Sequence, residues 1–124
     1  MDIIISNSSE VPIYEQIKTQ IKEMIIDGRL KAGDALPGMR TLAKDLKVSV
    51  ITTKRAYNEL EKEAYIVTTP GKGSFVANMN RELLKEEQLK NIEKNLQEAI
   101  DIARPVEVSL EELKEMLDIL YRGE

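Results

Sequence analysis

A glycine-rich stretch, "TTPGKGSF" at residues 68–75, is the first place in this chain where side chains could do chemistry. A lysine and a serine beside two glycines can form a loop that cradles a phosphate group. The Walker-type loop, however, follows the pattern G-x-x-x-x-G-K-[ST]. Here Gly71 and Lys72 are followed by Gly73 instead of serine, and Ile66 stands where the first glycine should be. The stretch therefore predicts a tight turn between two strands and not a nucleotide-binding loop.

The side chains that most enzymes use are missing. The 124-residue chain has no histidine and no cysteine. This composition excludes imidazole bases, thiol nucleophiles, disulfides and most zinc sites. No pair of carboxylates stands out against the helical faces. We therefore expect no enzymatic activity, no metal site and no other cofactor.

The charge is unevenly distributed along the chain. The net charge of −4 argues against nucleic acid as a partner. Residues 1–79 nevertheless hold 11 Lys/Arg against 10 Asp/Glu, whereas residues 80–124 hold 7 against 12. The net charges of the two parts are thus +1 and −5, so the first part is free to carry a local basic face.

The apolar run at the N-terminus covers only Ile3 to Ile5. It is far too short for the core of a signal peptide or for a membrane span. We therefore expect a cytoplasmic protein that does not associate with a membrane.

Three helices are predicted before residue 64. The first lies within residues 12–27, where isoleucine and methionine recur at helical spacing and Gly28 provides a stop. A short helix at residues 38–46 follows a loop rich in glycine and proline. A longer helix at residues 50–63 comes next, and Ser49 is well suited to cap its N-terminus.

The longer helix has one face that we expect to be buried. Ile51, Ala56 and Leu60 are predicted to face inward. Val50 and Tyr57 are placed near the edge of that face. The polar residues of its first turns would then face outward.

A β-hairpin is predicted after the third helix. The segments "YIVTT" and "SFVA" are rich in β-branched and aromatic residues. They flank the Pro-Gly-Lys-Gly turn, which is typical of a hairpin.

The remainder of the chain is predicted to be two more helices. One covers residues 81–103 and ends before Pro105. The other opens at Ser109 and Glu112, which match the S-x-x-E capping box. Apolar residues recur at spacings of three and four in both helices: Leu89, Ile92, Leu96, Ile100, Leu110, Leu113, Leu117 and Leu120.

The predicted fold is therefore mostly α with a small β-hairpin. A short helix and a longer helix joined by a tight turn form a helix-turn-helix, and the hairpin after them makes it a winged version. Residues 1–79 are assigned to this winged helix-turn-helix domain, and residues 80–124 to a two-helix tail.

The amino-acid sequence of the first domain resembles that of the GntR family of bacterial transcriptional regulators. The patterns "P-x-Y-x-Q-I", "G-x-L-x-x-G-D-x-L-P", "R-x-L-A-x-x-L-x-V-S", "A-Y-x-x-L" and "G-x-G-x-F-V" occur in this order from Pro12 to Val76. The short tail is similar to that of the YtrA-like subfamily. The resemblance implies a DNA-binding regulator, and members of that subfamily often repress ABC transporter genes beside their own.

The resemblance also implies which residues contact double-stranded DNA. In the family, the start of the second helix, the start of the recognition helix and the tip of the wing carry these contacts. The corresponding residues here are Arg40, Ser49, Val50, Thr52, Thr53, Lys54, Arg55, Gly71, Lys72, Gly73 and Ser74. Arginine suits guanine because its planar fork matches O6 and N7, whereas Val50 offers only apolar contact, for instance to a thymine methyl.

The tail is expected to form a homodimer through its apolar stripes, since the subfamily uses its short tail in this way. A two-fold dimer places two recognition helices one DNA turn apart, about 34 Å, and so predicts an inverted-repeat operator. The alternative is a dimerisation module that antagonises a true regulator without binding DNA. A small-molecule effector is compatible with either of these functions, but the sequence does not indicate which molecule it would be.

Three residues depart from the family pattern. Gly38 replaces a serine that would cap the second helix. Ala64 replaces a glycine, which would cost about 1 kcal/mol if that position has a positive φ. Thr53 replaces a valine and places a hydroxyl where a methyl group normally packs.

Overall fold

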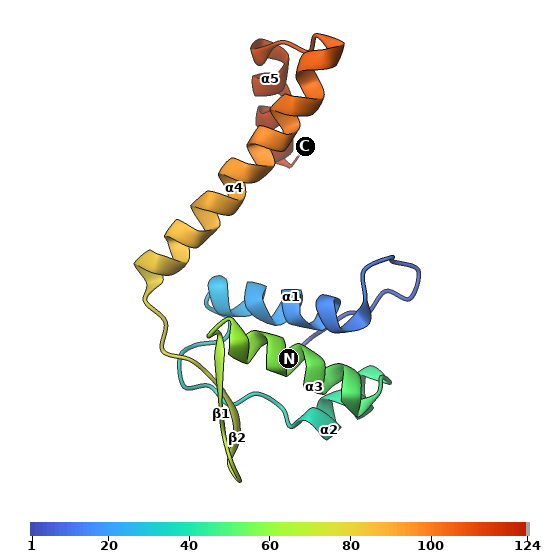
Figure 1. Ribbon diagram of the computed structural model, residues 1–124, viewed down its shortest axis with the longest axis vertical. Coiled ribbons are helices and arrows are strands. Elements are labelled where there is room, and N and C mark those ends of the chain that lie inside the picture. The colour runs from blue at the N-terminus through green and yellow to red at the C-terminus, as the bar shows by residue number, and fades with distance from the viewer. Residues whose placement is uncertain (124) are drawn as a thin grey trace. The chain divides into compact units, whose positions relative to one another are not determined.

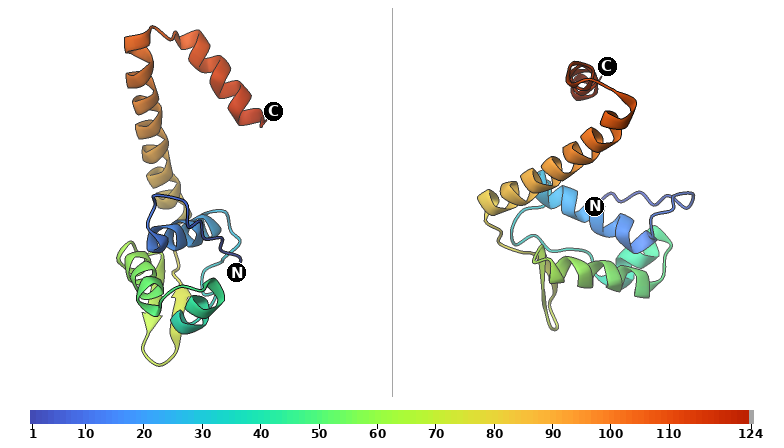
Figure 2. Two further views of the ribbon diagram at one scale, coloured as in Figure 1. Left: turned by 90° about the vertical axis from the view of Figure 1, so that its right-hand side faces the viewer. Right: turned by 45° about the horizontal axis from the view of Figure 1, so that its top comes forward.

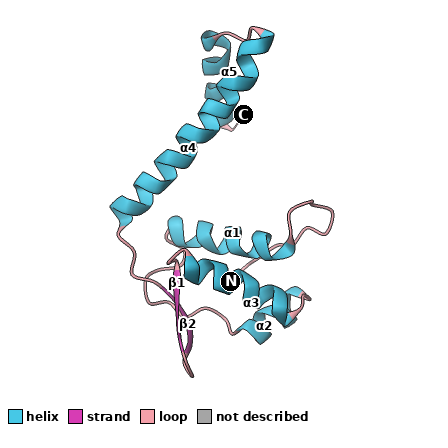
Figure 3. Cartoon of the chain, in the orientation of Figure 1, coloured by secondary structure: helices cyan, strands magenta, loops and turns pink. Residues whose placement is uncertain are grey.

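The computed structural model describes residues 1–123, which divide into two compact units, residues 1–80 and a second unit that begins at Arg81. Figures 1 and 3 show their helices and strands. The first unit contains α1 (Ile13–Ile26), α2 (Met39–Leu46), α3 (Val50–Lys62), β1 (Ile66–Thr69) and β2 (Gly73–Val76). The second contains α4 (Arg81–Ala103), the short 3-10 helix η1 (Arg104–Val106) and α5 (Leu110–Arg122). The mostly helical fold with one small hairpin confirms the predicted fold class.

The core of the first unit is built around α3, against which both α1 and α2 pack. The buried residues of α1 are Ile17, Ile21, Met24 and Ile25. Those of α3 are Thr53, Ala56, Tyr57 and Leu60. Both sets follow the three- and four-residue spacing of one helical face, so burial of apolar surface fixes α3 between its neighbours.

The predicted inward face of α3 was partly wrong. Ile51 is 80% exposed, whereas Tyr57, which was placed near the edge, is only 1% exposed. The reason is the helical period: Ile51 lies five residues before Ala56, which is not a same-face spacing. Thr53 precedes Ala56 and Tyr57 by three and four residues, so it takes the inward position instead.

The cap of α3 is as the sequence predicts. The Ser49 hydroxyl accepts a hydrogen bond from the Thr52 N–H at 3.1 Å. Two non-glycine residues flanking α2 and α3 have positive φ angles, Lys47 at 59° in the turn before α3 and Ala64 at 64° after it. Ala64 thus has the positive φ that would make alanine costly at this position, and its backbone is strained where that of a glycine would not be.

The hairpin forms an antiparallel pair in which Ile66 lies opposite Val76. At its tip the Lys72 N–H donates to the Thr69 carbonyl at 3.0 Å. Pro70 and Gly71 occupy the two central positions of this turn, and Gly71 has a φ of 78°. Proline followed by a residue with positive φ is the signature of a type II turn, so the sequence-based prediction of a tight turn is confirmed.

The base of the hairpin is tied to the loop before α2. The Leu36 N–H donates to the Ser74 carbonyl and the Val76 N–H donates to the Asp34 carbonyl, both at 2.9 Å. The same loop thus leads into α2 and supports β2. This arrangement links the wing to the helix-turn-helix within one unit.

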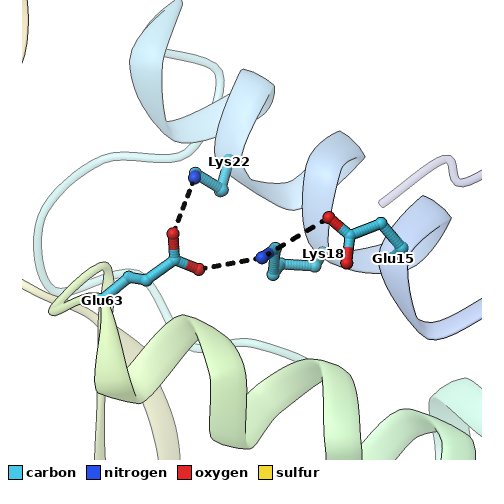
Figure 4. A network of polar contacts seen from close by, with 4 residues as sticks. All are labelled: Glu15, Lys18, Lys22 and Glu63. Atoms are coloured by element: carbon cyan, nitrogen blue, oxygen red, sulfur yellow. Dashed lines mark hydrogen bonds and ion pairs between the residues drawn. The ribbon is translucent and has the colours of Figure 1, made fainter. Parts of the chain in front are cut away.

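An ion-pair network joins α1 to the end of α3 (Figure 4). The Glu63 carboxylate lies 3.1 Å from the Lys18 Nζ and 3.0 Å from the Lys22 Nζ. Burial alone would raise the pKa of the Glu63 carboxyl, but the hydrogen bonds and charges of Lys22 and Lys18 outweigh it and hold that pKa below its usual value. Burial alone would lower the pKa of Lys18, but the hydrogen bond and charge of Glu63 outweigh burial and raise that pKa.

The second unit is a helical hairpin. Pro105 lies in η1, where it ends the path of α4, and the Ser109 hydroxyl caps α5 by accepting from the Glu112 N–H at 3.1 Å. Figure 2 shows α4 and α5 diverging from this turn. Among the described residues of α5, none is buried.

Candidate nucleic-acid interface

The first basic side chain of the interface is Arg40, which is exposed in the first turn of α2. It forms no ion pair with a described residue, so neither Asp34 nor Asp45 neutralises it. A guanidinium group that is exposed and uncompensated is available for a DNA base or phosphate.

The start of α2 is held in place by Tyr57, whose role the sequence did not reveal. The Tyr57 hydroxyl donates to the Pro37 carbonyl at 2.6 Å. Burial raises the pKa of this hydroxyl to about 12, so it stays protonated and able to donate. Because Pro37 immediately precedes the cap residue Gly38, this bond fixes the path of the chain just before Arg40.

The first turn of α3 presents a mixed surface. Ser49 and Thr52 contact each other through their hydroxyls at 2.8 Å. Val50 is 44% exposed and Ile51 is 80% exposed. Ile51 was not among the predicted site residues, although its failure to fit the spacing of the buried face could have revealed it. Exposed aliphatic side chains at the end of a recognition helix are suited to thymine methyl groups.

The prediction that Thr53 contacts DNA was wrong. Its side chain is 0% exposed. Its hydroxyl donates to the Met39 carbonyl at 3.1 Å and lies 2.9 Å from the Val50 carbonyl. Thr53 therefore ties α3 to the start of α2, and its hydroxyl is satisfied in the place where a methyl group was expected to pack.

The two basic residues of α3 differ in their surroundings. Lys54 is exposed and forms no ion pair with a described residue. Arg55 is exposed too, but its guanidinium lies over the ring of Tyr14, 3.8 Å from the ring centroid. This cation–π contact connects α3 to α1. A phosphate contact by Lys54 or Arg55 stays a prediction.

The wing tip carries one cation, Lys72, which is exposed between Gly71 and Gly73. In the views of Figure 1 and Figure 2 (left), the tip of the hairpin and α2 both lie on the side of the first unit away from α1. Neither glycine would meet a neighbouring atom if it carried a Cβ, but both have a positive φ. Their role in the structure is therefore to shape the turn.

The prediction that Ser74 donates to DNA was wrong. Its side chain is only 7% exposed. Its hydroxyl is paired with the Thr68 hydroxyl across the hairpin at 2.9 Å. The Ser74 hydroxyl therefore helps to hold the two strands together.

A second surface lies on the tail. The apolar stripe of α4 is only partly covered, with Leu89 43%, Ile92 52% and Leu96 47% exposed. In α5, Leu110, Leu117 and Leu120 are 64%, 53% and 77% exposed. Ile100 and Leu113 are half-buried. The predicted stripes thus exist, but the single chain leaves a large part of their surface in contact with water.

Other kinds of site are not seen in the part of the chain that the structure describes. No group of three or more acidic residues in residues 1–123 could hold a metal ion. None of the described helices has the length and apolarity needed to cross a membrane.

Two helices joined by a tight turn, a third helix behind them and a following hairpin define a winged helix-turn-helix protein. Comparisons with known proteins agree. The family model for bacterial regulatory proteins of the gntR family matches residues 13–76 of this chain. The HTH-type transcriptional repressor YtrA of Bacillus subtilis (strain 168) is 37% identical over 115 residues, which cover 93% of this chain and 88% of that protein.

Solved structures share the fold. The crystal structure of a transcriptional antiterminator from Listeria monocytogenes EGD-e has a TM-score of 0.76 and 33% identity, covering 98% of this chain and 90% of that one. The structure of the AraR DNA-binding domain in complex with operator ORE1 has a TM-score of 0.53 and 25% identity, covering 62% of this chain and 94% of that one.

The chain belongs to the GntR family of bacterial regulatory proteins and is YtrA-like. The resemblance inferred from the sequence motifs is thereby confirmed. The protein is a DNA-binding transcription regulator, and members of this family are not enzymes.

Proposed function

We propose that the protein is a cytoplasmic repressor that binds an inverted-repeat operator as a homodimer. The observation that carries the proposal is the joint exposure of two surfaces. One is the set of uncompensated cations Arg40, Lys54 and Lys72 in the winged helix-turn-helix unit. The other is the apolar surface of α4 and α5, which a single chain leaves open.

The first surface has the composition that DNA binding requires. Arg40 and the first turn of α3, with Val50, Ile51 and Thr52, supply base contacts. Lys54 and Lys72 supply phosphate contacts, and Arg55 adds one if its guanidinium keeps an edge free above Tyr14. Phosphate contacts provide affinity without sequence information, whereas the base contacts select the operator.

The apolar residues of α5 extend around more of the helix than a single neighbouring helix can cover. At about 100° per residue, the apolar positions of α5 from Leu110 to Tyr121 span about 200° of the helix circumference. Met116 and Ile119, 55% and 51% exposed, extend the leucine stripe on one side. In α4, the apolar residues from Leu89 to Ile100 form a single stripe. A second copy of the chain is the partner that covers the remaining surface, because it brings the same stripes in self-complementary form.

The relatives support repression as the proposed activity and suggest which genes it would regulate. The Bacillus subtilis relative is named a transcriptional repressor, and the YtrA-like resemblance suggests an ABC transporter operon as the target. An inverted repeat upstream of such an operon near this gene would identify the operator.

A fluorescence anisotropy titration with DNA from the upstream region of the chain's own gene tests the proposal. We expect binding that a shuffled sequence does not reproduce and that weakens steeply as salt rises, because bound cations release counterions from DNA. Equal affinity for the shuffled sequence, or no salt dependence, would contradict it.

The second candidate, an antagonist that dimerises without binding DNA, is favoured by the acidic net charge of −4. Replacing Arg40 and Lys54 by alanine separates the two functions. Loss of operator binding with the dimer intact supports the repressor. An antagonist would show no operator binding in the unmodified chain, so the substitution would change nothing.

A further inference from the structure

The segment before α1 is held on that helix by two glutamine side chains. The Ile4 N–H donates to the Gln20 Oε1 at 2.9 Å, and the Gln20 Nε2 donates back to the Ile4 carbonyl at 2.7 Å. One side-chain amide thus satisfies both backbone groups of one residue, as a neighbouring strand would do.

The same arrangement is repeated one turn earlier in α1. The Ser6 N–H donates to the Gln16 Oε1 at 2.8 Å, and the Gln16 Nε2 donates to the Ser6 carbonyl at 3.0 Å. Four residues of a helix rise about 6 Å and two residues of a strand about 6.6 Å, so the two spacings match. The spacing of these bonds indicates that the segment runs extended and opposite in direction to α1.

In extended backbone, successive side chains point to opposite sides, so the isoleucines on either side of Ile4 face the other way. Ile3 is only 9% exposed and Ile5 is half-buried, whereas Ile4 is 80% exposed. Ile3 and Ile5 line a cavity of about 400 Å³ whose other walls include Leu46, Val48 and Ser49. Leu46 is the last residue of α2, Val48 lies in the turn of the helix-turn-helix, and Ser49 caps α3.

We infer that Gln16 and Gln20 are positioning residues for DNA binding. They fasten the N-terminal segment, and the segment places Ile3 and Ile5 behind the turn that sets the start of α3. Neither glutamine touches the proposed DNA-contacting side chains, so both act through the segment. The inference rests on the proposed function, since it concerns the geometry with which the recognition helix meets the operator.

We expect the N-terminal segment to change the fraction of molecules whose α3 is in the geometry that binds DNA. When the segment is detached, the turn between α2 and α3 loses one of its apolar walls, and a smaller fraction of molecules presents α3 in the binding geometry. The apparent dissociation constant rises by the inverse of that fraction. The number of phosphate contacts in the complex does not change, because no basic residue is removed.

The test compares Gln20→Met with Thr19→Ala in the full chain. Methionine keeps the length and apolar body of glutamine but can neither donate to nor accept from Ile4. Thr19 is exposed beside Gln20 in α1 and serves as the matched control. Hydrogen exchange of the Ile4 and Ser6 amides, operator affinity and its salt slope are measured at a temperature where circular dichroism shows every variant folded.

We expect the Ile4 amide of Gln20→Met to exchange at least about tenfold faster, because it loses its acceptor. We expect operator binding about fivefold weaker with an unchanged salt slope. Thr19→Ala should behave as the unmodified chain, and Gln16→Met should reproduce the Gln20→Met pattern.

Two results would overturn the inference. Faster exchange with unmodified affinity would show that the segment does not influence DNA binding. Unchanged exchange would show that Gln20 does not hold the segment. If the unmodified chain itself bound no operator, the proposed function would fail first and take the positioning role with it.

Discussion

The two units of the molecule differ in how far they bury their apolar side chains. In the first unit Ile17, Ile21 and Leu60 are completely buried between α1 and α3. In the second unit the leucines of α5 are more than half exposed at three of their four positions. Both sets follow helical periodicity, so the pattern alone does not distinguish a closed core from an open one.

The difference teaches where each unit obtains its stability. The first unit closes its core with its own three helices and hairpin. We propose that the tail closes its core only with a second chain, so its stability depends on protein concentration. Substitutions confined to one unit therefore reveal whether the other unit depends on it.

The largest effect is expected from charges placed on the tail. Leu113→Asp combined with Leu117→Asp buries two carboxylates in the proposed dimer interface, and the dimer should dissociate. Affinity for an inverted repeat should fall about a hundredfold, because two linked recognition helices bind far better than one. Analytical ultracentrifugation and anisotropy measure the two effects.

The control adds the same two charges elsewhere. Asn91→Asp combined with Asn95→Asp has the same four-residue spacing on the exposed, polar side of α4. This variant should remain dimeric and bind normally. A monomeric control variant, or a dimeric leucine variant, would contradict the assignment of the apolar stripes.

The next effect concerns Arg40. Removing its guanidinium in Arg40→Ala should weaken operator binding by about 1–3 kcal/mol and relax base preference at one position of each half-site. Lys72→Ala should instead weaken binding to all sequences alike and lower the salt slope by about 1. Binding to a panel of operators with single base changes distinguishes the two. If Arg40→Ala kept full base preference, Arg40 would not be a base contact.

A smaller effect is expected from the support beneath Arg40. Tyr57→Phe leaves the Pro37 carbonyl without its donor and should lower the free energy of unfolding by about 1–2 kcal/mol. Since burial raises the pKa of Tyr57 above its usual value of 10, to about 12, its contribution is present below pH 10 and is lost as pH rises toward 12. Urea denaturation at pH 7 and pH 11 measures both. A Phe variant as stable as the unmodified chain at pH 7 would show that this hydrogen bond is not needed.

Relief of strain at Ala64 should stabilise the first unit. The φ of 64° is unfavourable for alanine and not for glycine. Ala64→Gly should therefore raise the free energy of unfolding by about 1 kcal/mol. Thermal unfolding checks it, with the oligomeric state of the tail expected to stay the same. A lower unfolding temperature would mean that the entropy of the unfolded chain outweighs the relieved strain.

The smallest effect is expected from the network of Figure 4. The lowered pKa of Glu63 contributes stability above the usual carboxyl pKa of 4.5, and this contribution is lost as pH falls below it. The carboxylate is 37% exposed, so solvent screening limits the effect of Glu63→Gln to roughly 0.5 kcal/mol at pH 7. The difference between the variant and the unmodified chain should shrink toward pH 3. A difference that stayed constant with pH would assign it to packing and not to charge.

The sequence predicted the helices and strands because local signals specify them. Ser49 and Ser109 cap their helices as expected, and the proline and glycine of the wing tip specify its turn. Motif spacing placed Arg40 and Lys72 at exposed positions of the family's interface.

The rest depended on contacts that no local pattern encodes. The burial of Ser74 comes from its pairing with Thr68 across the hairpin. Thr53 was predicted to face outward with the other polar residues of the first turns of α3, although its spacing from Tyr57 favours the core. The glutamines of α1 look like ordinary surface residues until the N-terminal segment is placed beside them.

We propose that two copies of the first unit, joined through the tail, bind the two half-sites of one operator. The most direct test is the affinity of the unmodified chain for a complete inverted repeat and for a single half-site of equal DNA length. We expect about a hundredfold preference for the repeat, and we expect the Leu113→Asp, Leu117→Asp variant to lose it. Equal affinity of the unmodified chain for both DNAs would contradict it.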